Sequence, residues 1–149
     1  MEGIVSFRDI QTHDYENSKS LLSFLTKTKE DFSLESFTDL CSSLNSNHRI
    51  ICCVFNDIES GLNIMVAMGT ILIEKKLIHN CGCVGHIEDV VVHENYRNIN
   101  VGKALIEHMI NIAKERQVYK VILNCNEGNA DFYRKCGFHK SNLQMRTNI

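Results

Sequence analysis

The sequence predicts an α/β protein with one mixed, mostly antiparallel β-sheet that is flanked by helices on both faces. Its 149 residues suffice for one ordinary domain, and no composition shift, low-complexity tract or internal repeat divides residues 1–149. Segments with strand and helix periodicity follow one another in the order β-α-α-β-β-β-α-β-α-β. Because this order neither alternates strictly nor separates strands from helices, it favours a mixed sheet between two layers of helices.

The first half of the chain predicts a strand, two helices and a β-hairpin. The first strand alternates apolar and polar side chains, and the hairpin strands are apolar runs on either side of a polar turn. Ser33 is a candidate N-cap for the second helix. The expected bounds are 4–10 for the first strand, about 14–28 and 34–44 for the helices, and 49–55 and 62–73 for the hairpin.

The second half predicts two strands around a long helix, followed by a short helix and a last strand. The run Val121-Ile122-Leu123 is continuously apolar, as expected of a strand covered on both faces. Gly137 is placed to end the short helix as a C-terminal cap. The expected bounds are a strand that ends near residue 93, a helix at 101–116, a strand at 119–125, a helix at 129–135 and a final strand within 138–145.

The composition argues against several functional classes. The chain is 44% hydrophobic and 23% charged, and its net charge of −2, without a dense basic run, argues against a nucleic-acid partner. No apolar segment approaches the roughly 20 residues that cross a bilayer, and the N-terminus lacks the pattern of a secretory signal. The seven cysteines are an odd number, which argues against a disulfide framework. We therefore expect a soluble cytoplasmic protein with reduced thiols and no membrane partner.

The turn from Arg97 to Gly102 predicts a phosphate site. The β-branched run Val90-Val91-Val92 precedes it, and an amphipathic helix follows it. The free N–H groups and the positive dipole end of that helix would point at one spot. Asn98 and Asn100 belong to the residue type that, apart from glycine, best tolerates the positive φ of an anion-binding nest. A generic glycine-bearing turn is the alternative, but the basic residue at each end favours phosphate.

The acidic pair Glu88-Asp89 opens the valine strand. In a regular strand adjacent side chains point to opposite faces, so only one carboxylate could face a given pocket. A β-bulge, which is common beside active sites, would let both contribute. The alternative is that one carboxylate is solvated and the other pairs with a nearby cation.

Tyr133 is a candidate general acid. It lies in the segment Phe132-Tyr133-Arg134-Lys135-Cys136-Gly137-Phe138, after the polar turn Asn124 to Asn129. A helical tyrosine is most often part of an amphipathic core. Its phenol could instead donate a proton to a leaving group.

A metal site is the less favoured interpretation of His79, Cys81, Cys83 and His86. These four candidate ligands lie within eight residues. Their spacing matches neither a Cys-x-x-Cys knuckle nor a helical histidine pair, and so short a turn would have to fold around the ion. We therefore expect no metal. Nucleophilic catalysis by cysteine and histidine has no local signature beyond the presence of both residue types.

Several segments together resemble the GNAT superfamily of N-acetyltransferases and, within it, the eukaryotic-type glucosamine 6-phosphate N-acetyltransferases. The resemblance covers about residues 65–138 and is looser in the first 55 residues. The motifs that carry it are Ile73-Glu-Lys-Lys-Leu-Ile-His79, Gly85-His-Ile-Glu-Asp-Val-Val-Val92, Gly102-Lys103, Tyr119-Lys120 and Asn129-x-x-Phe-Tyr-x-Lys-Cys-Gly-Phe138.

The resemblance implies a GNAT fold and direct acetyl transfer from acetyl-CoA to the amine of glucosamine 6-phosphate, for UDP-N-acetylglucosamine synthesis. It implies a homodimer with shared active sites, in which Tyr119 and Lys120 reach the sugar phosphate of the neighbouring subunit. Tyr133 would protonate the CoA thiolate, and Glu88 is a catalytic candidate. The implied acetyl-CoA site comprises Val90, Val91, Val92, Arg97, Asn98, Ile99, Asn100, Val101, Gly102, Lys103, Asn129, Tyr133 and Lys135. The implied acceptor site comprises Thr26, Lys76, His79, Glu88, Asp89, Tyr119, Lys120, Asn124 and Arg146.

Two positions depart from the pattern of the superfamily. Asn100 stands where the pyrophosphate turn usually carries a glycine, and asparagine still accepts positive φ. Asn124 stands where relatives carry an acidic residue on the sugar side, and an amide cannot act as a base. Glu88 or an ordered water would then take the proton from the amine. The rival interpretations are a GNAT enzyme for another amine, such as a protein N-terminus or a polyamine, and a catalytically weak acyl-CoA-binding module.

Overall fold

The computed structural model describes residues 3–25 and 31–149. Apart from the short helix Ile78–Cys81, which the sequence did not predict, their strands and helices follow the predicted order as far as the helix Ala130–Lys135. The bounds are β1 Gly3–Asp9, α1 Tyr15–Leu22, α2 Leu34–Ser43, β2 His48–Asp57, β3 Asn63–Lys75, α3 Ile78–Cys81, β4 Cys83–Val92, α4 Val101–Glu115, β5 Val118–Leu123 and α5 Ala130–Lys135. The predicted cap of α2 is confirmed, because the Ser33 side chain accepts a hydrogen bond from the Ser36 N–H.

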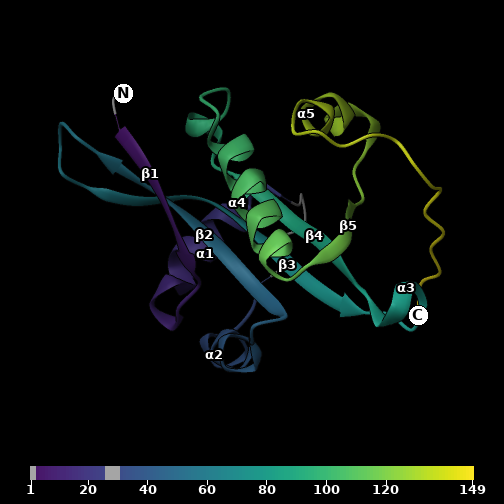
Figure 1. Cartoon of the computed structure of the whole chain (residues 1–149). Helices are drawn as coiled ribbons and strands as arrows, with labels where there is room; N and C mark the ends of the chain where they lie inside the picture. The colour runs from purple at the N-terminus through teal and green to yellow at the C-terminus, as the bar shows by residue number, and fades with distance from the viewer. Residues whose placement is uncertain (1–2, 26–30) are drawn as a thin grey trace.

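The five strands form one mixed sheet in the order β1-β2-β3-β4-β5. The pairs from β1 to β4 are antiparallel, and β4 and β5 are parallel. A parallel pair needs a long crossover connection, which α4 supplies as it runs across one face of the sheet (Figure 1). The predicted mixed, mostly antiparallel sheet is confirmed.

Two apolar cores cover the two faces of this sheet. On one face α4 contributes Leu105, Ile106 and Met109, all fully buried, to a cluster that also includes side chains of α5. On the other face α1 and α2 contribute Leu21 and Phe37 to a second cluster. Helices therefore lie on both faces, as the order of elements predicted.

A buried ion pair fixes the start of α1 against the sheet. Arg8 on β1 donates to both carboxylate oxygens of Asp14, at 2.6 and 2.7 Å, and the Gln11 N–H donates to the same carboxylate at 2.9 Å. Burial alone would raise the pKa of Asp14, but these hydrogen bonds outweigh burial and hold that pKa below its ordinary value. The contacts set the position of the helical layer that faces the acidic pair.

Three predictions about the elements were wrong. Helix α1 ends at Leu22, before the predicted end at residue 28, although residues 26–30 lie outside the described part. Strand β5, the last strand of the sheet, is not covered on both faces, because Ile122 stays 40% exposed. Residues 138–149 form no strand. That segment runs from α5 towards α3 away from the sheet edges (Figure 1), and it leaves Leu143 and Met145 exposed.

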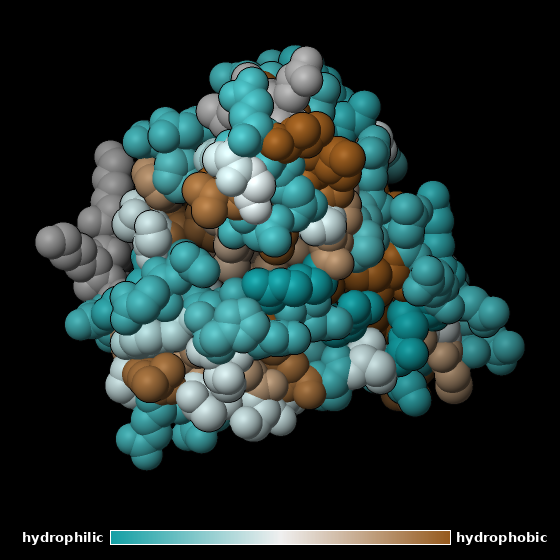
Figure 2. Space-filling view, turned by 90° about the vertical axis from the view of Figure 1, so that its left-hand side faces the viewer, coloured by the Kyte–Doolittle hydropathy of each residue, from teal (hydrophilic) through white to brown (hydrophobic). Residues whose placement is uncertain are grey.

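The surface beside β1 carries hydrophobic side chains as separate patches between hydrophilic ones (Figure 2). No helix within residues 3–25 and 31–149 is long and apolar enough to cross a membrane. All seven cysteines are free thiols. Burial raises the pKa of Cys52 and of Cys53 to about 12, so both remain protonated and pack as small apolar side chains.

Candidate active site

A β-bulge lies at the acidic pair. Glu88 pairs with Thr70 and Val91 with Met68, so Asp89 and Val90 together oppose the single residue Gly69. Asp89 has a φ of 51°, which a regular strand does not contain. A Cβ on Gly69 would lie 3.0 Å from the Met109 side chain, so glycine lets α4 pack closely there.

The bulge puts both carboxylates on the same face of the sheet. Ile87 and Val90 both pack in the core under α4, although they are three positions apart. Glu88 and Asp89, between them, therefore lie on the opposite face, and Asp89 lines a cavity there with side chains of α1 and α2. The question that the sequence left open is answered in favour of a shared face.

Beyond the bulge, β4 has an open edge. Its pairing with β5 ends at Ile87 and Leu123, while β4 continues to Val92. The His93 N–H donates to the Val66 carbonyl of β3 at 2.8 Å. Because the N–H and C=O groups of successive residues in a strand point alternately to its two sides, those of Val90 and Val92 point away from β3. The Val92 carbonyl accepts a hydrogen bond from Arg97 Nε at 3.1 Å. These strand positions can offer backbone groups to an extended ligand.

The turn before α4 has the backbone conformation that the sequence predicted. Asn98 and Asn100 both have a φ of 65°, and Asn100 directly precedes the first turn of α4. The first N–H groups of a helix lack intrahelical acceptors and lie at the positive end of its dipole. A Cβ on Gly102 would lie 3.2 Å from both Phe132 and Val92, so glycine lets α4, α5 and β4 approach closely there. Lys103 stays about half exposed on the same turn.

Tyr133 lies on α5, the helix whose Phe132 packs against Gly102 in the first turn of α4. Burial raises its pKa to about 12, with further increases from Cys125, Cys136 and Glu88. The phenol packs against the core cluster under α4, next to Phe132 and Phe138. Among the described residues the Tyr133 hydroxyl has no hydrogen-bond partner, so its proton is available to a bound group.

The predicted acceptor-side residues form two groups next to β4 and β5. His79 packs on Tyr119 with ring centroids 4.2 Å apart, and Lys120 Nζ lies 5.7 Å from the centre of the same ring. Lys76 pairs with Glu74 at 2.6 Å, and Glu74 in turn bonds His86 at 2.8 Å.

Glu74 and His86 are site neighbours that the sequence did not assign to the acceptor site, although His86 was considered as a metal ligand. His86 shares the face of Glu88 by alternation along β4. Alternation along β3 and β4 was the signal that could have found both.

Among the described residues, no hydrogen bond or ion pair links Asn124 or Arg146 to these acceptor-side groups, so their predicted roles stay predictions. Asn124 is exposed just after β5, and Arg146 lies in the irregular tail, where it bonds Asn148 at 2.8 Å. Thr26 lies outside the described residues.

The candidate metal ligands make other contacts. His79 stacks on Tyr119 and His86 bonds Glu74, and the described segments bring no three His, Cys, Asp or Glu side chains into an ion-binding group. The short α3 turn between the histidines is left-handed, with φ between 53° and 59° at His79, Asn80 and Cys81.

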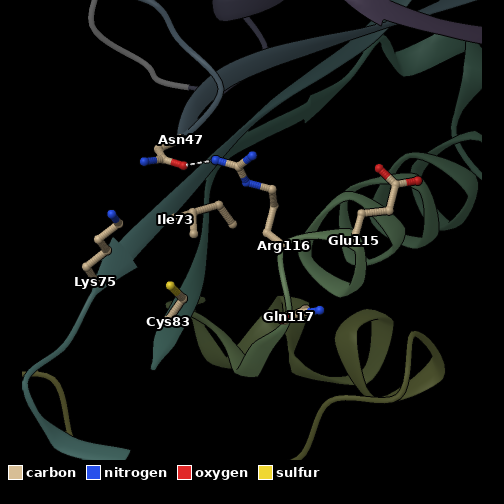
Figure 3. Close-up of a pocket in the computed structure, with 7 residues that line it drawn as sticks. All are labelled: Asn47, Ile73, Lys75, Cys83, Glu115, Arg116 and Gln117. Atoms are coloured by element: carbon tan, nitrogen blue, oxygen red, sulfur yellow. Dashed lines mark hydrogen bonds between the residues drawn. The ribbon is translucent and has the colours of Figure 1, made fainter. Parts of the chain in front are cut away.

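Of two cavities in the structure, one is lined by a predicted acceptor-site residue and the other is not. One, which we call the apolar cavity, has a volume of about 310 Å³ and lies between α1, α2 and the sheet, with Asp89 in its wall. The other, of about 250 Å³, lies at the far end of α4, where Arg116 bonds Asn47 (Figure 3). No residue of the predicted acetyl-CoA or acceptor site lines this second cavity. The apolar cavity is therefore the one that adjoins the candidate active site.

Comparison with known proteins agrees with this geometry. The model of the acetyltransferase (GNAT) family matches residues 5–138. Glucosamine 6-phosphate N-acetyltransferase 1 of Dictyostelium discoideum is 38% identical over 95% of this chain and 88% of its own. The Candida albicans glucosamine 6-phosphate N-acetyltransferase is 36% identical over 94% of this chain and 93% of its own.

Solved structures agree as well. The crystal structure of glucosamine-6-phosphate N-acetyltransferase from Arabidopsis thaliana superposes with a TM-score of 0.81 at 34% identity, covering 97% of this chain and 98% of that one. A Trypanosoma brucei acetyltransferase superposes with a TM-score of 0.80 at 31% identity, covering 98% and 100% of the two chains. This chain therefore belongs to the acetyltransferase (GNAT) family, in the group of the eukaryotic glucosamine 6-phosphate N-acetyltransferases.

Proposed function

We propose that this protein transfers the acetyl group of acetyl-CoA to the amine of glucosamine 6-phosphate, giving N-acetylglucosamine 6-phosphate and CoA. The product would feed UDP-N-acetylglucosamine synthesis. The observation that carries the proposal is the bulge, which puts Glu88 and Asp89 on one face directly beside the open edge of β4. The names of the relatives supply the acceptor.

The open edge and the turn before α4 fit acetyl-CoA, the donor that the family implies. Backbone groups of Val90 and Val92 face away from β3 and would hold the thioester and the pantetheine arm. The pyrophosphate would bind the Asn98–Lys103 backbone, where two positive φ values and the helix N-terminus direct N–H groups outward.

Proton transfer is the main demand that this reaction makes on the side chains. The thioester is already activated, so alignment of the amine with the carbonyl supplies much of the acceleration. Glu88 and Asp89 would attract the ammonium form of the sugar, and Glu88, directly or through water, would accept its proton before attack. Asn124 cannot do so, because an amide has no basic oxygen.

Tyr133 would complete the cycle on the donor side. A phenol with a pKa of about 12 stays protonated at neutral pH and can pass its proton to the departing CoA sulfur. The amine attacks the carbonyl carbon, the C–S bond breaks, and the proton that Tyr133 gives up returns from solvent.

The acceptor site would be completed by a second subunit. Tyr119, Lys120 and Ile122 are exposed on the edge strand β5, the position from which an adjacent protomer could be reached. In the homodimer that we propose, Tyr119 and Lys120 would contact the sugar phosphate bound by the neighbour. The free thiols fit a reducing compartment, so we assign the reaction to the cytoplasm.

One assay tests the proposal: release of the CoA thiol from acetyl-CoA in the presence of separate amines. We expect release with glucosamine 6-phosphate and much less with glucosamine, because only the phosphate ester can engage Lys120. Preference for a polyamine or a peptide N-terminus would assign another acceptor. Binding of acetyl-CoA without turnover of any amine would contradict enzymatic function.

A further inference from the structure

The apolar cavity is lined mostly by hydrophobic side chains, which an amino-sugar phosphate does not require. Its volume of about 310 Å³ lies at the lower end of the roughly 300–1,000 Å³ usual for small-molecule pockets. Ile10, Leu22, Phe37 and Leu40 contribute to its walls. A phosphate or a sugar hydroxyl among these side chains would lose its hydration without compensation, so this space suits a hydrocarbon group.

Ser18 is one of the polar residues that line the cavity, together with Ser36, Thr70 and Asp89. Its side chain is 1% exposed, and within residues 3–25 and 31–149 its hydroxyl has no hydrogen-bond partner. A buried hydroxyl without a partner is energetically costly, and a ligand that supplies a partner removes that cost. The cavity is therefore suited to a ligand with an apolar body and one hydroxyl.

Asp89 gives the cavity a charged position at its solvent side. Asp89 is exposed, in contrast to Ser18, and both line the same cavity. The next residue, Val90, has backbone groups on the open edge where the thioester is to be held. Asp89, which would hold the ammonium group, is thus the neighbour on β4 of Val90, which would hold the thioester carbonyl of acetyl-CoA.

We propose that the apolar cavity admits a second class of acetyl acceptor, a small aliphatic primary amine with a terminal hydroxyl. This inference rests on the proposed acetyl transfer and extends it to an acceptor without phosphate. The ammonium pairs with Asp89, the hydrocarbon chain occupies the cavity and the hydroxyl bonds Ser18. After the amine loses a proton to Asp89 or water, its nitrogen bonds the acetyl carbon. The C–S bond breaks, and the sulfur leaves as the CoA thiol with the proton from Tyr133.

The test measures acetyl transfer to hexylamine and to 6-amino-1-hexanol, with glucosamine 6-phosphate assayed in parallel. We expect turnover of both amines. Leu40→Trp should fill the cavity from its rim and lower kcat/KM for both amines about tenfold, while glucosamine 6-phosphate turnover changes less than about twofold. Leu34→Trp is the matched control, because Leu34 is exposed on the same helix and does not line the cavity.

Ser18→Ala tests the role of the Ser18 hydroxyl separately. It should lower kcat/KM about fivefold for 6-amino-1-hexanol and leave hexylamine unchanged, because only the amino alcohol loses a hydrogen bond. Ser20→Ala, an exposed serine on the same helix, should change neither.

The other outcomes of these assays distinguish failure of this inference from failure of the proposed function. Turnover of glucosamine 6-phosphate without turnover of either amine would overturn this inference and leave the proposed function intact, whereas no turnover of any acceptor would contradict both. Equal effects of the two tryptophan variants on the amines would also overturn it. So would a result in which Leu40→Trp abolishes only the use of hexanoyl-CoA, since the cavity would then hold acyl chains.

Discussion

At the scale of single residues, backbone strain is concentrated around β4. Positive φ occurs at Asp89 in the bulge, at Asn98 and Asn100 before α4, and in the α3 turn from His79 to Cys81. For an L-residue this conformation costs roughly 1–2 kcal/mol. Such strain persists where the surrounding structure enforces it, and it is typical of ligand sites. This conformation makes the segments that precede, interrupt and follow β4 candidates for ligand binding.

Tyr133 is the residue whose chemistry can be tested most directly. Tyr133→Phe should lower kcat about tenfold to a hundredfold with little change in acetyl-CoA affinity, because only the proton donor is removed. With a pKa of about 12, the wild-type phenol should stay protonated up to at least pH 10, so its ionisation should not reduce kcat in that range. Steady-state kinetics between pH 6 and about pH 10 measure both effects.

A phenol elsewhere in the fold provides the control for that prediction. Tyr15 donates a hydrogen bond to the Phe32 carbonyl at 2.7 Å. Tyr15→Phe should lower thermal stability and leave kcat unchanged. If Tyr133→Phe also left kcat unchanged, the general-acid role would be refuted.

Ser18 makes an opposite prediction about stability. Ser18→Ala should raise the free energy of unfolding by about 1–3 kcal/mol, because it removes a buried hydroxyl that has no partner among the described residues. The midpoint of urea unfolding measures the change. Ser20→Ala reports the helix-propensity gain alone, since Ser20 is exposed on the same helix. A gain no larger than that of Ser20→Ala would mean that the Ser18 hydroxyl is satisfied in solution.

At the scale of elements, the sequence correctly predicted those features that depend only on residues close together along the chain. The Ser33 cap, the hairpin and the asparagine turn each depend on neighbouring residues, and the structure confirms them. The exposed side of β5 could not be predicted, because an apolar run does not reveal whether a second layer covers it. The same limit applies to the tail, where residues 138–145 had room for a strand but pair with no sheet edge.

The bulge in the candidate site likewise depends partly on local sequence and partly on pairing between strands. The sequence identified Glu88 and Asp89 but left their orientation open, because it depends on the offset of register against Met68 and Thr70. The sequence did not assign Glu74 and His86 to the acceptor site, because their contact joins two strands that are adjacent only in the folded sheet. The pairing between β3 and β4, rather than the residue types, determines how these four side chains are oriented.

The turn before α4 tests how an element presents its backbone. Asn100→Val should raise the KM for acetyl-CoA about tenfold, because a β-branched residue disfavours a φ of 65° and would distort the nest. Asn100→Gly should keep the KM within about twofold, since glycine adopts this conformation freely. Calorimetric titration with CoA gives the same comparison without turnover. Asn95→Val, at an exposed residue outside the positive-φ positions, is the control, and an equal effect there would contradict a backbone role for the turn.

At the scale of the whole molecule, the two edges of the sheet differ in what adjoins them. The β1 edge exposes Ile4, at 66%, and carries no predicted site residue. The β5 edge exposes Tyr119 and Ile122, at 38% and 40%, next to Lys120 and the His79 turn. Strand edges and apolar faces left open are the surfaces on which chains associate. A dimer through β5 would cover apolar surface and bring cationic and aromatic side chains to the neighbouring acceptor site.

This asymmetry between the edges gives a matched pair of variants. Ile122→Lys should halve the molar mass measured by light scattering, because it places a charge on the surface that the partner would cover. It should also reduce glucosamine 6-phosphate turnover more than acetyl-CoA binding, since Tyr119 and Lys120 would no longer reach the neighbouring sugar phosphate. Ile4→Lys introduces the same charge on the opposite edge and should alter neither property. A wild-type protein that is monomeric and fully active, or an Ile122→Lys monomer with unchanged KM for the sugar phosphate, would contradict a shared site and place every acceptor contact within one chain.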